Sequence, residues 1–303
     1  MIAGVSGGDW GIRGFLAAYK AASGERVWRH WTVPSKGEPG YDTWKGNAVT
    51  YGGGATWLTG SYDPDTDTLY WTTGNPYPDS DDRERGGDNL YTNCVLALHP
   101  DTGKMKWHYQ FTPHDVHDWD ATEPNVLVDT KFRGLDRKLL LHADRNGFFY
   151  VFDRTDGHLL LTQKLIRRLT WASGIGPDGR PLLLPETDVT CPEDATNWNA
   201  TAFSPVTRLY YITSWSLKSV RSNSRPAVGR VSVRGRNPGR SICVRSILRQ
   251  GSSFGKFRNS DQPTARGWRE CWQRPREYCS METQAGNLWP WTIGMGKRCG
   301  TYR

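Results

Sequence analysis

Several common signals are absent from this 303-residue sequence, and each absence excludes a class of protein. No stretch approaches the roughly 20 consecutive apolar residues of a membrane-spanning helix, which excludes a helical integral membrane protein. The first six residues run directly into a Gly-rich segment without a basic or a long apolar region, so we expect no signal peptide in this chain. No Cys-x-x-Cys-His occurs, which excludes a covalently attached haem c, and the cysteines near the C-terminus lack the spacing of a zinc site.

Glycine and tryptophan are abundant, whereas the charges are divided unevenly along the chain. The 33 Gly, 15 Trp and mean hydropathy of −0.66 favour a turn-rich, aromatic-rich β protein. From position 218 to the end there are 18 Lys+Arg and 4 Asp+Glu, a net charge of +14. The preceding residues hold 21 basic and 27 acidic side chains, a net charge of −6. The sequence therefore predicts two regions, 1–217 and 218–303.

Short hydrophobic strands recur in pairs through the first region. One kind of pair has a Gly-containing turn, and it occurs around Gly24, Gly103 and Gly157. The other kind has a polar or Pro-containing turn, and it occurs over 56–72 and 200–212. Each pair has the pattern of a β-hairpin, and two hairpins make a four-stranded sheet. Recurring four-stranded sheets predict the blades of a β-propeller.

Residues 218–303 show neither strand alternation nor helical periodicity. A basic tail that binds nucleic acid is one interpretation. We favour another, because such tails are usually poor in Trp and Cys, whereas this one holds four of each. We interpret it as the product of a frameshift near 213–217, expect it to be disordered, and expect no nucleic-acid partner.

The stretch Thr112–Glu123 concentrates ionisable groups after a predicted strand. It contains four carboxylates, two imidazoles and one Trp within twelve residues. Crowded carboxylates raise one another's pKa, a cost that functional sites commonly carry. A solvated acidic loop is the alternative interpretation.

Five separated motifs together resemble the pyrroloquinoline-quinone (PQQ) dependent alcohol dehydrogenases, which are periplasmic eight-bladed propellers. The motifs are Ser6-Gly7-Gly8-Asp9 with Gly11-Ile12-Arg13-Gly14, Gly52-Gly53-Gly54-Ala55-Thr56-Trp57, Gly74-Asn75-Pro76, Asp118-Trp119-Asp120, and Asp144-Arg145-Asn146-Gly147. The resemblance runs from Gly4 to about Ile212 and implies an all-β, partial eight-bladed propeller of three to four blades, whose hairpins carry tryptophan-docking motifs. It also implies a periplasmic location.

The resemblance implies a PQQ site built from several segments. Trp57 matches the tryptophan that stacks on the quinone, although a core Trp is the alternative. The positions that would bind the remainder of the cofactor are Ser6, Gly7, Gly8, Thr56, Arg145, Asn197 and Trp198.

A Ca²⁺ ion on the cofactor is implied as well, held by Asp9, Asn75 and Asp120. Asp9 stands where the family has Glu, one methylene longer, so it would reach the ion through a closer loop or a water. Lanthanide-using relatives carry a further Asp at the position of Thr122, which favours Ca²⁺ here.

The implied reaction is oxidation of an alcohol to an aldehyde, with hydride transfer to C5 of the quinone. Asp120 matches the general base, and Asp118 is its competitor within the motif. Arg145 matches the residue that stabilises charge on the quinone oxygen, a surface arginine being the alternative; relatives that oxidise glucose carry Lys there, which favours an alcohol substrate. His114 and His117 are interpreted as hydrogen-bonding loop residues.

An alternative function is a non-catalytic β-propeller that serves as an assembly scaffold. It would not need Asp120, Asn75, Arg145 or Trp57, whose joint presence favours the enzyme. The resemblance implies a cytochrome c or a quinone as electron acceptor and leaves a monomer and a homo-oligomer both open. Because the matching region makes about half a propeller, sheet edges stay open, and we expect this polypeptide alone to be inactive or misfolded.

Overall fold

The computed structural model describes residues 1–166, 169–185, 195–214, 242–243 and 246–247, all within one compact unit, Met1–Gln262. The predicted boundary near residue 217 and nearly all of the predicted tail lie outside the described residues. No helix among the described residues is long and apolar enough to cross a membrane.

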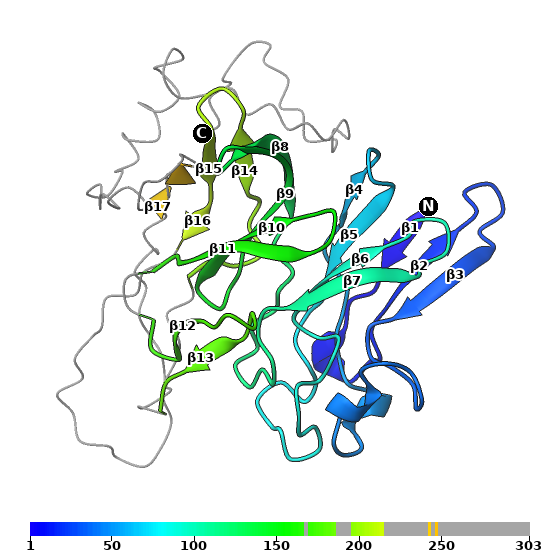
Figure 1. Cartoon of the computed structure of the whole chain (residues 1–303). Coiled ribbons are helices and arrows are strands. Elements are labelled where there is room, and N and C mark those ends of the chain that lie inside the picture. The colour runs from blue at the N-terminus through cyan, green and yellow to red at the C-terminus, as the bar shows by residue number, and fades with distance from the viewer. Residues whose placement is uncertain (167–168, 186–194, 215–241, 244–245, 248–303) are drawn as a thin grey trace, which may run out of the picture. The chain divides into compact units, whose positions relative to one another are not determined.

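Antiparallel strands dominate the described residues (Figure 1), as the sequence predicts. The strands of the first sheets are β1 (Ile2–Gly4), β2 (Phe15–Tyr19), β3 (Arg26–Trp31), β4 (Ser61–Asp63), β5 (Thr68–Thr72), β6 (Cys94–Leu98), β7 (Met105–Gln110), β8 (Val126–Phe132), β9 (Leu135–Ala143), β10 (Phe148–Asp153) and β11 (His158–Lys164). The later strands are β12 (Ala172–Ile175), β13 (Pro181–Leu183), β14 (Ala202–Ser204), β15 (Leu209–Tyr211), β16 (Thr213–Ser214), β17 (Ile242–Cys243) and β18 (Ser246–Ile247). Three short 3₁₀ helices are η1 (Gly8–Trp10), η2 (Tyr41–Thr43) and η3 (Ala48–Thr50).

Two complete four-stranded sheets, β4–β7 and β8–β11, form the centre of the described structure. Each is an up-and-down antiparallel meander, and β1–β3 and β14–β15 belong to incomplete neighbours. Every hairpin predicted from the sequence is present, although the hairpin predicted over 56–72 starts its first strand only at Ser61. The β8–β9 hairpin was not predicted; its turn has positive φ at Arg133 and Gly134.

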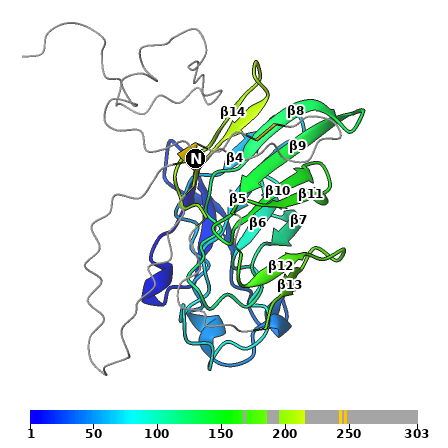
Figure 2. The same ribbon diagram turned by 90° about the vertical axis from the view of Figure 1, so that its left-hand side faces the viewer.

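Both faces of the sheet β4–β7 are buried, and the alternation of a strand explains how. All five residues of β6 are buried, and successive side chains point to opposite faces. Val95 and Ala97 join a core shared with β9 and β10, whereas Leu96 and Leu98 join one shared with β2 and β3. Figure 1 shows the sheets in chain order, from β1–β3 through β4–β7 to β8–β11, and Figure 2 shows the last two of them from the side. The layered arrangement is that of consecutive propeller blades.

Tryptophans on the last strand of one sheet dock on the Gly turn of the next. Trp28 Nε1 donates to Pro100 O at 2.9 Å, and a Cβ at Gly103 would lie 2.5 Å from the Trp28 ring. Trp107 repeats the contact one sheet later: its Nε1 donates to Arg154 O at 3.3 Å, and a Cβ at Gly157 would lie 2.6 Å from its ring. Both glycines also have positive φ. These contacts are the tryptophan-docking motifs expected from the sequence.

A buried arginine joins the two complete sheets. Arg154, in the turn after β10, is 2.7 Å from Asp63 of β4 and 2.5 Å from Asp129 of β8. Burial alone would raise the pKa of Asp63, but hydrogen bonds from Arg154 and Thr66 outweigh burial and lower it to about 2. Arg154 therefore links the two complete sheets. They belong to a partial propeller, which does not close into a ring within the described residues.

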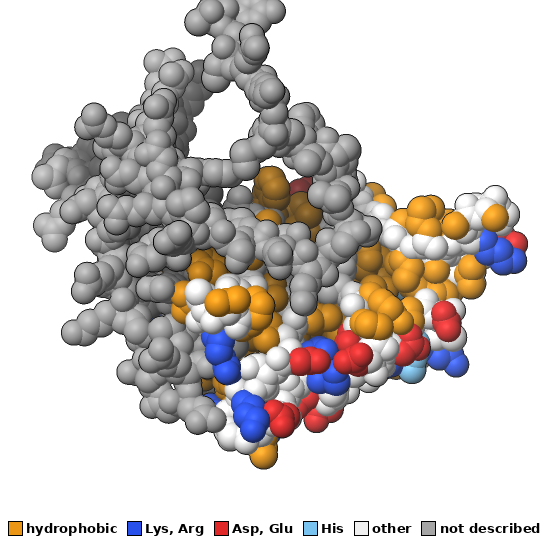
Figure 3. All heavy atoms as spheres, turned by 90° about the horizontal axis from the view of Figure 1, so that it is seen from above, with side chains coloured by type: hydrophobic (Ala, Val, Ile, Leu, Met, Phe, Trp, Pro, Cys, Tyr) orange, Lys and Arg blue, Asp and Glu red, His pale blue; other side chains and the backbone are white. Residues whose placement is uncertain are grey.

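The visible surface of the described residues carries acidic and basic side chains close together along one side in Figure 3, with hydrophobic side chains beyond them. Interspersed charges of both signs are typical of a solvated protein surface.

Candidate functional site

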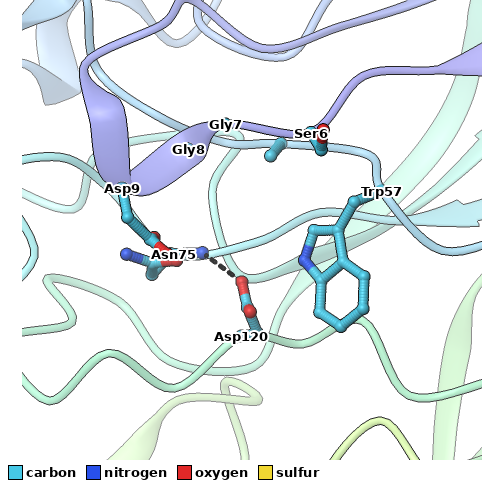
Figure 4. Close-up of a pocket in the computed structure, with 8 residues that line it drawn as sticks. Ser6, Gly7, Gly8, Asp9, Trp57, Asn75 and Asp120 are labelled. Atoms are coloured by element: carbon cyan, nitrogen blue, oxygen red, sulfur yellow. Dashed lines mark hydrogen bonds between the residues drawn. The ribbon is translucent and has the colours of Figure 1, made fainter.

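A pocket of about 210 Å³ is bounded by residues from four separate segments of the chain. Its lining residues are Ser6, Gly7, Gly8, Asp9, Ala55, Trp57, Asn75 and Asp120. Figure 4 shows the side chains of Asp9, Asn75 and Asp120 converging, with the Trp57 ring beside them. Seven of these eight residues belong to the predicted site; Ala55 is the exception, although it lies within a quoted motif. The structure therefore brings the predicted metal ligands together.

Tight backbone turns place the first group of lining residues. η1 is flanked by Gly7 and Gly11, both in the left-handed conformation, which glycine adopts without strain. Thr56 N donates to Val5 O at 2.8 Å, which holds the segment of Trp57 beside the segment of Ser6. The glycines of these motifs allow the two backbone segments to lie this close together.

Gly74 allows the carboxylate of Asp120 to reach the pocket. A Cβ at position 74 would lie 2.3 Å from Asp120 Oδ1, a distance that no side chain tolerates. With glycine there, Asn75 N donates to Asp120 Oδ1 at 3.1 Å. The Gly74-Asn75 pair thus couples the predicted base to a predicted metal ligand.

Asp115 anchors the loop that carries Asp120, a role that sequence reasoning did not assign. This carboxylate is 1% exposed and accepts hydrogen bonds from the backbone N–H of His117 at 2.8 Å and of Trp119 at 2.8 Å. Asn93 Nδ2 donates to it at 3.1 Å. The spacing Asp-x-His-x-Trp resembles an ordinary turn in sequence, so only the fold shows that Asp115 organises the loop.

The electrostatics of Asp120 differ from those of a free aspartate. Burial raises its pKa, the Asn75 N–H lowers it and the nearby charge of Asp9 raises it, for a value of about 6. A pKa in this range lets a carboxylate accept a proton near neutral pH. This perturbation accompanies a pocket and is therefore a marker of a functional site.

Asp118 and Arg145 lie beside the pocket rather than in its lining. Arg145 Nη1 is 3.9 Å from Asp118 Oδ2, and the Asp118 side chain is 43% exposed. Burial raises the pKa of Asp118, Arg145 lowers it, and Asp120 and Asp9 raise it further. Asp120 lines the pocket and Asp118 pairs with Arg145, an arrangement that favours Asp120 as the base.

The pocket chemistry fits a hard cation and a flat aromatic ligand. Asp9, Asn75 and Asp120 offer oxygen donors, which Ca²⁺ prefers. The Asn75 Nδ2 donates to Pro76 O at 3.1 Å, so its amide oxygen is the atom left for a cation. Trp57 is 36% exposed at the pocket edge and offers an indole surface on which a planar ring can stack.

Other predicted cofactor residues do not line the pocket. The Thr56 side chain is 1% exposed, donates to Phe15 O at 2.6 Å and accepts from Val5 N at 2.9 Å, so it links backbone segments. Asn197 Oδ1 accepts from Trp198 N at 2.8 Å, and Trp198 is 56% exposed. The roles of Thr56, Asn197, Trp198 and Arg145 stay predictions.

Of the two loop histidines, His114 hydrogen-bonds through its ring, as expected, whereas Nδ1 of His117 has no hydrogen-bond partner among the described residues. His114 Nδ1 lies 2.6 Å from Gly87 O, and Nε2 lies 3.0 Å from Asp82 Oδ2. His117 stacks on Trp119 with a centroid distance of 4.1 Å. A second group, Glu123, His142 and Asp144, lies buried outside the pocket lining and was not identified as a cluster from the sequence.

Comparison with known proteins places this geometry in a family. Residues 6–164 match the family model described as PQQ, glucose/ethanol/alcohol dehydrogenase, beta-propeller domain. The chain is 38% identical over 234 residues to a quinohemoprotein alcohol dehydrogenase of Comamonas testosteroni, covering 70% of this chain and 33% of that protein. It is also 38% identical over 249 residues to a lanthanide-dependent methanol dehydrogenase of Methylorubrum extorquens, covering 70% and 41%.

Solved structures agree with the sequence comparison. The Comamonas enzyme superposes with a TM-score of 0.65 at 38% identity, covering 71% of this chain and 35% of that one. A europium-containing methanol dehydrogenase superposes with a TM-score of 0.67 at 34% identity, covering 71% and 42%. The chain thus spans between a third and about two fifths of the length of these relatives. On its sequence, its blades and its pocket, this chain belongs to the family of PQQ-dependent alcohol dehydrogenase β-propellers.

Proposed function

We propose that the described blades carry the PQQ and metal site of an alcohol dehydrogenase, which oxidises an alcohol to an aldehyde. The observation that carries the proposal is the convergence of Asp9, Asn75 and Asp120 beside Trp57 in one pocket. When bound, the quinone supplies the acceptor for the two electrons of the alcohol and the cation polarises it.

Asp120 is the proposed base. Its buried carboxylate would take the hydroxyl proton of the alcohol as the C–H bond is broken. The Asn75 N–H hydrogen bond, 3.1 Å long, holds the carboxylate in one orientation. Asp115 positions Asp120 by fixing the backbone at Trp119.

The remaining pocket residues bind and orient. Trp57 would hold the flat cofactor by stacking, and the backbone of Ser6, Gly7 and Gly8 would offer it polar contacts. Arg145 lies close enough to lower the pKa of Asp120 and adds positive charge beside it. A cytochrome c or a quinone is the proposed partner that would reoxidise the reduced cofactor, and we propose a periplasmic location for the whole enzyme.

Calcium is the proposed cation. The pocket offers two carboxylates and one amide oxygen, and Thr122 stands where lanthanide-using relatives have a further aspartate. Fewer carboxylates favour a divalent over a trivalent ion, because each supplies one negative charge.

The first test is binding of PQQ to the chain by equilibrium dialysis, with and without Ca²⁺. We expect Ca²⁺ to increase PQQ affinity at least tenfold and La³⁺ to replace it poorly. Trp57→Ala should weaken PQQ binding by about tenfold or more, since base-stacking contacts of this kind contribute roughly 1–3 kcal/mol. Tyr62→Ala, which removes an aromatic ring that is 52% exposed outside the pocket, is the matched control.

Catalysis is best tested in a hybrid, because the chain spans a third of the Comamonas relative. Residues 6–164 would replace the corresponding blades of that enzyme, and alcohol-dependent dye reduction would be measured. A hybrid that folds and binds PQQ but reduces no dye, with Asp120 intact, would contradict the proposed reaction.

A further inference from the structure

Three ligand-type side chains meet in the interior away from the pocket lining. Glu123 lies in the loop between β7 and β8, His142 lies on β9, and Asp144 follows directly after β9. They are 1%, 0% and 0% exposed, and one donor atom of each lies within 4.8 Å of the others. His142 and Asp144 are two residues apart at the end of a strand, so their side chains point to the same face.

Neighbouring groups orient the imidazole of His142 toward the carboxylates. Its Nδ1 lies 3.1 Å from Asn125 Oδ1, an acceptor, so Nδ1 carries a hydrogen. The ring stacks on Phe111 with a centroid distance of 4.3 Å and an interplanar angle of 20°. Nε2 therefore faces Asp144 Oδ2 at 3.2 Å. Metal-binding histidines are commonly oriented in this way, through a hydrogen bond from the nitrogen that does not bind the ion.

The two carboxylates are incompletely compensated: burial outweighs the effect of Arg145, which lowers the pKa of Glu123, and that of His142, which lowers the pKa of Asp144. Glu123 Oε2 is buried and has no hydrogen-bond partner among the described residues. Asp144 uses Oδ1 to accept from Asn146 N at 2.8 Å, which leaves Oδ2 facing His142. Burial raises the pKa of Glu123 and of Asp144 because it disfavours their charged forms. A cation between the two carboxylates would offset this cost. A buried acceptor without a partner is costly and rare in folded proteins.

We propose that Glu123, His142 and Asp144 bind a divalent first-row transition metal ion, with Zn²⁺ the best fit. One imidazole and two carboxylates are a donor set that suits zinc rather than calcium, which prefers oxygen alone. Ligands about 2.0–2.2 Å from a tetrahedral ion lie roughly 3.4 Å apart, close to the 3.2 Å between His142 Nε2 and Asp144 Oδ2. The two carboxylates neutralise the charge of the ion.

Such an ion would join the loop of the catalytic base to the adjacent sheet. Glu123 lies three residues after Asp120, whereas His142 and Asp144 belong to the β9 end of the sheet β8–β11. The ion would thus restrict the loop that carries Asp120 without lining the pocket. This site is separate in residues and in chemistry from the proposed calcium site.

The test is the metal content of the full chain refolded in the presence of Zn²⁺, since a fully enclosed site fills during folding. After removal of loose metal with a weak chelator, we expect roughly one zinc per chain by mass spectrometry. Co²⁺ in place of Zn²⁺ should give the visible absorption bands of a tetrahedral site, and excess Ca²⁺ should not compete. Zinc should also raise the unfolding temperature, by about 5 °C or more.

The zinc content of matched variants shows whether the ion binds at this site or elsewhere. Glu123→Gln and His142→Gln should retain less than a tenth of the zinc. His114→Gln removes a different His–Asp contact, at the surface, and should retain it, as should Asp9→Asn in the proposed calcium site. Loss of PQQ binding with zinc retained would overturn the proposed function and not this site. Wild-type chain with less than a tenth of a zinc, or variants at Glu123 and His142 that bind it fully, would overturn the zinc site.

Discussion

Buried aspartates have opposite pKa shifts in two regions of the molecule. One region is the pocket, and the other is the joint, the contact between the sheets β4–β7 and β8–β11. Asp63, at the joint, is 3% exposed and paired with Arg154, and its pKa falls to about 2 despite burial. Asp120, in the pocket, receives one backbone hydrogen bond and faces other carboxylates, and its pKa rises to about 6. A guanidinium that hydrogen-bonds to a carboxylate makes it structural, whereas Asp120, on which Arg145 acts through its charge, is left able to take a proton or bind a cation.

The largest expected effect is on kcat, and it should follow from removing the carboxylate of Asp120 in the pocket. In the hybrid enzyme, Asp120→Asn should lower kcat by about 10²–10⁴-fold, because the general base is lost. PQQ binding should weaken far less. The same change at the joint, Asp63→Asn, should leave kcat within about twofold while lowering stability. Comparable losses of kcat in both variants would remove the distinction between joint and pocket.

Removing the guanidinium should show that the joint is held by charge pairing. Arg154→Met leaves Asp63 buried without its partner and should lower the free energy of unfolding by about 3–5 kcal/mol. Arg137→Met breaks the contact between Arg137 and Asp153, whose side chains are more exposed, at 27% and 15% respectively. This change should lower the free energy of unfolding by about 1 kcal/mol or less. Urea denaturation measures both. If the two variants lost equal free energy of unfolding, burial of the Arg154–Asp63 pair would not contribute to its effect on stability.

Acid should weaken the joint through Asp63. Its folded pKa, about 2, is below the unfolded value near 3.9, so its stabilisation is present above pH 4 and disappears as the pH falls through 2. The difference corresponds to about 2–3 kcal/mol. The stability gap between the wild-type chain and Asp63→Asn should therefore narrow by roughly two-thirds of that amount between pH 6 and pH 2.5. A gap that is constant with pH would contradict the pairing.

Two glycine turns offer a smaller test of blade docking. Gly24 and Gly157 both have positive φ, but Gly157 lies against the Trp107 ring, whereas a Cβ at Gly24 would meet nothing within 4 Å. Gly24→Ala should cost about 1 kcal/mol from backbone strain alone. Gly157→Ala should cost about 2 kcal/mol more, because the methyl group displaces the tryptophan. Thermal unfolding of the two variants measures the difference, and equal costs would exclude docking as a source of stability.

Much of the candidate site was predictable because its residues stand in contiguous motifs. Ser6–Asp9, Trp57, Asn75 and Asp120 were identified from the sequence and line one pocket. Thr56 belongs to the same motif, yet its hydroxyl bonds to Phe15 O and Val5 N, so sequence adjacency to Trp57 did not indicate where its side chain points. The cluster of Glu123, His142 and Asp144 was missed because its members come from two segments that only the fold brings together.

The sequence by itself determined the local elements of this protein. Alternating hydrophobic residues and Gly or Asp turns specify hairpins, because strand period and turn conformation depend on neighbouring residues. Tertiary structure decided which carboxylates hydrogen-bond to a guanidinium and which line the pocket. Arg154 reaches Asp63 across 91 positions and Asn75 reaches Asp120 across 45, so the charge state of each aspartate depends on contacts that no local pattern contains.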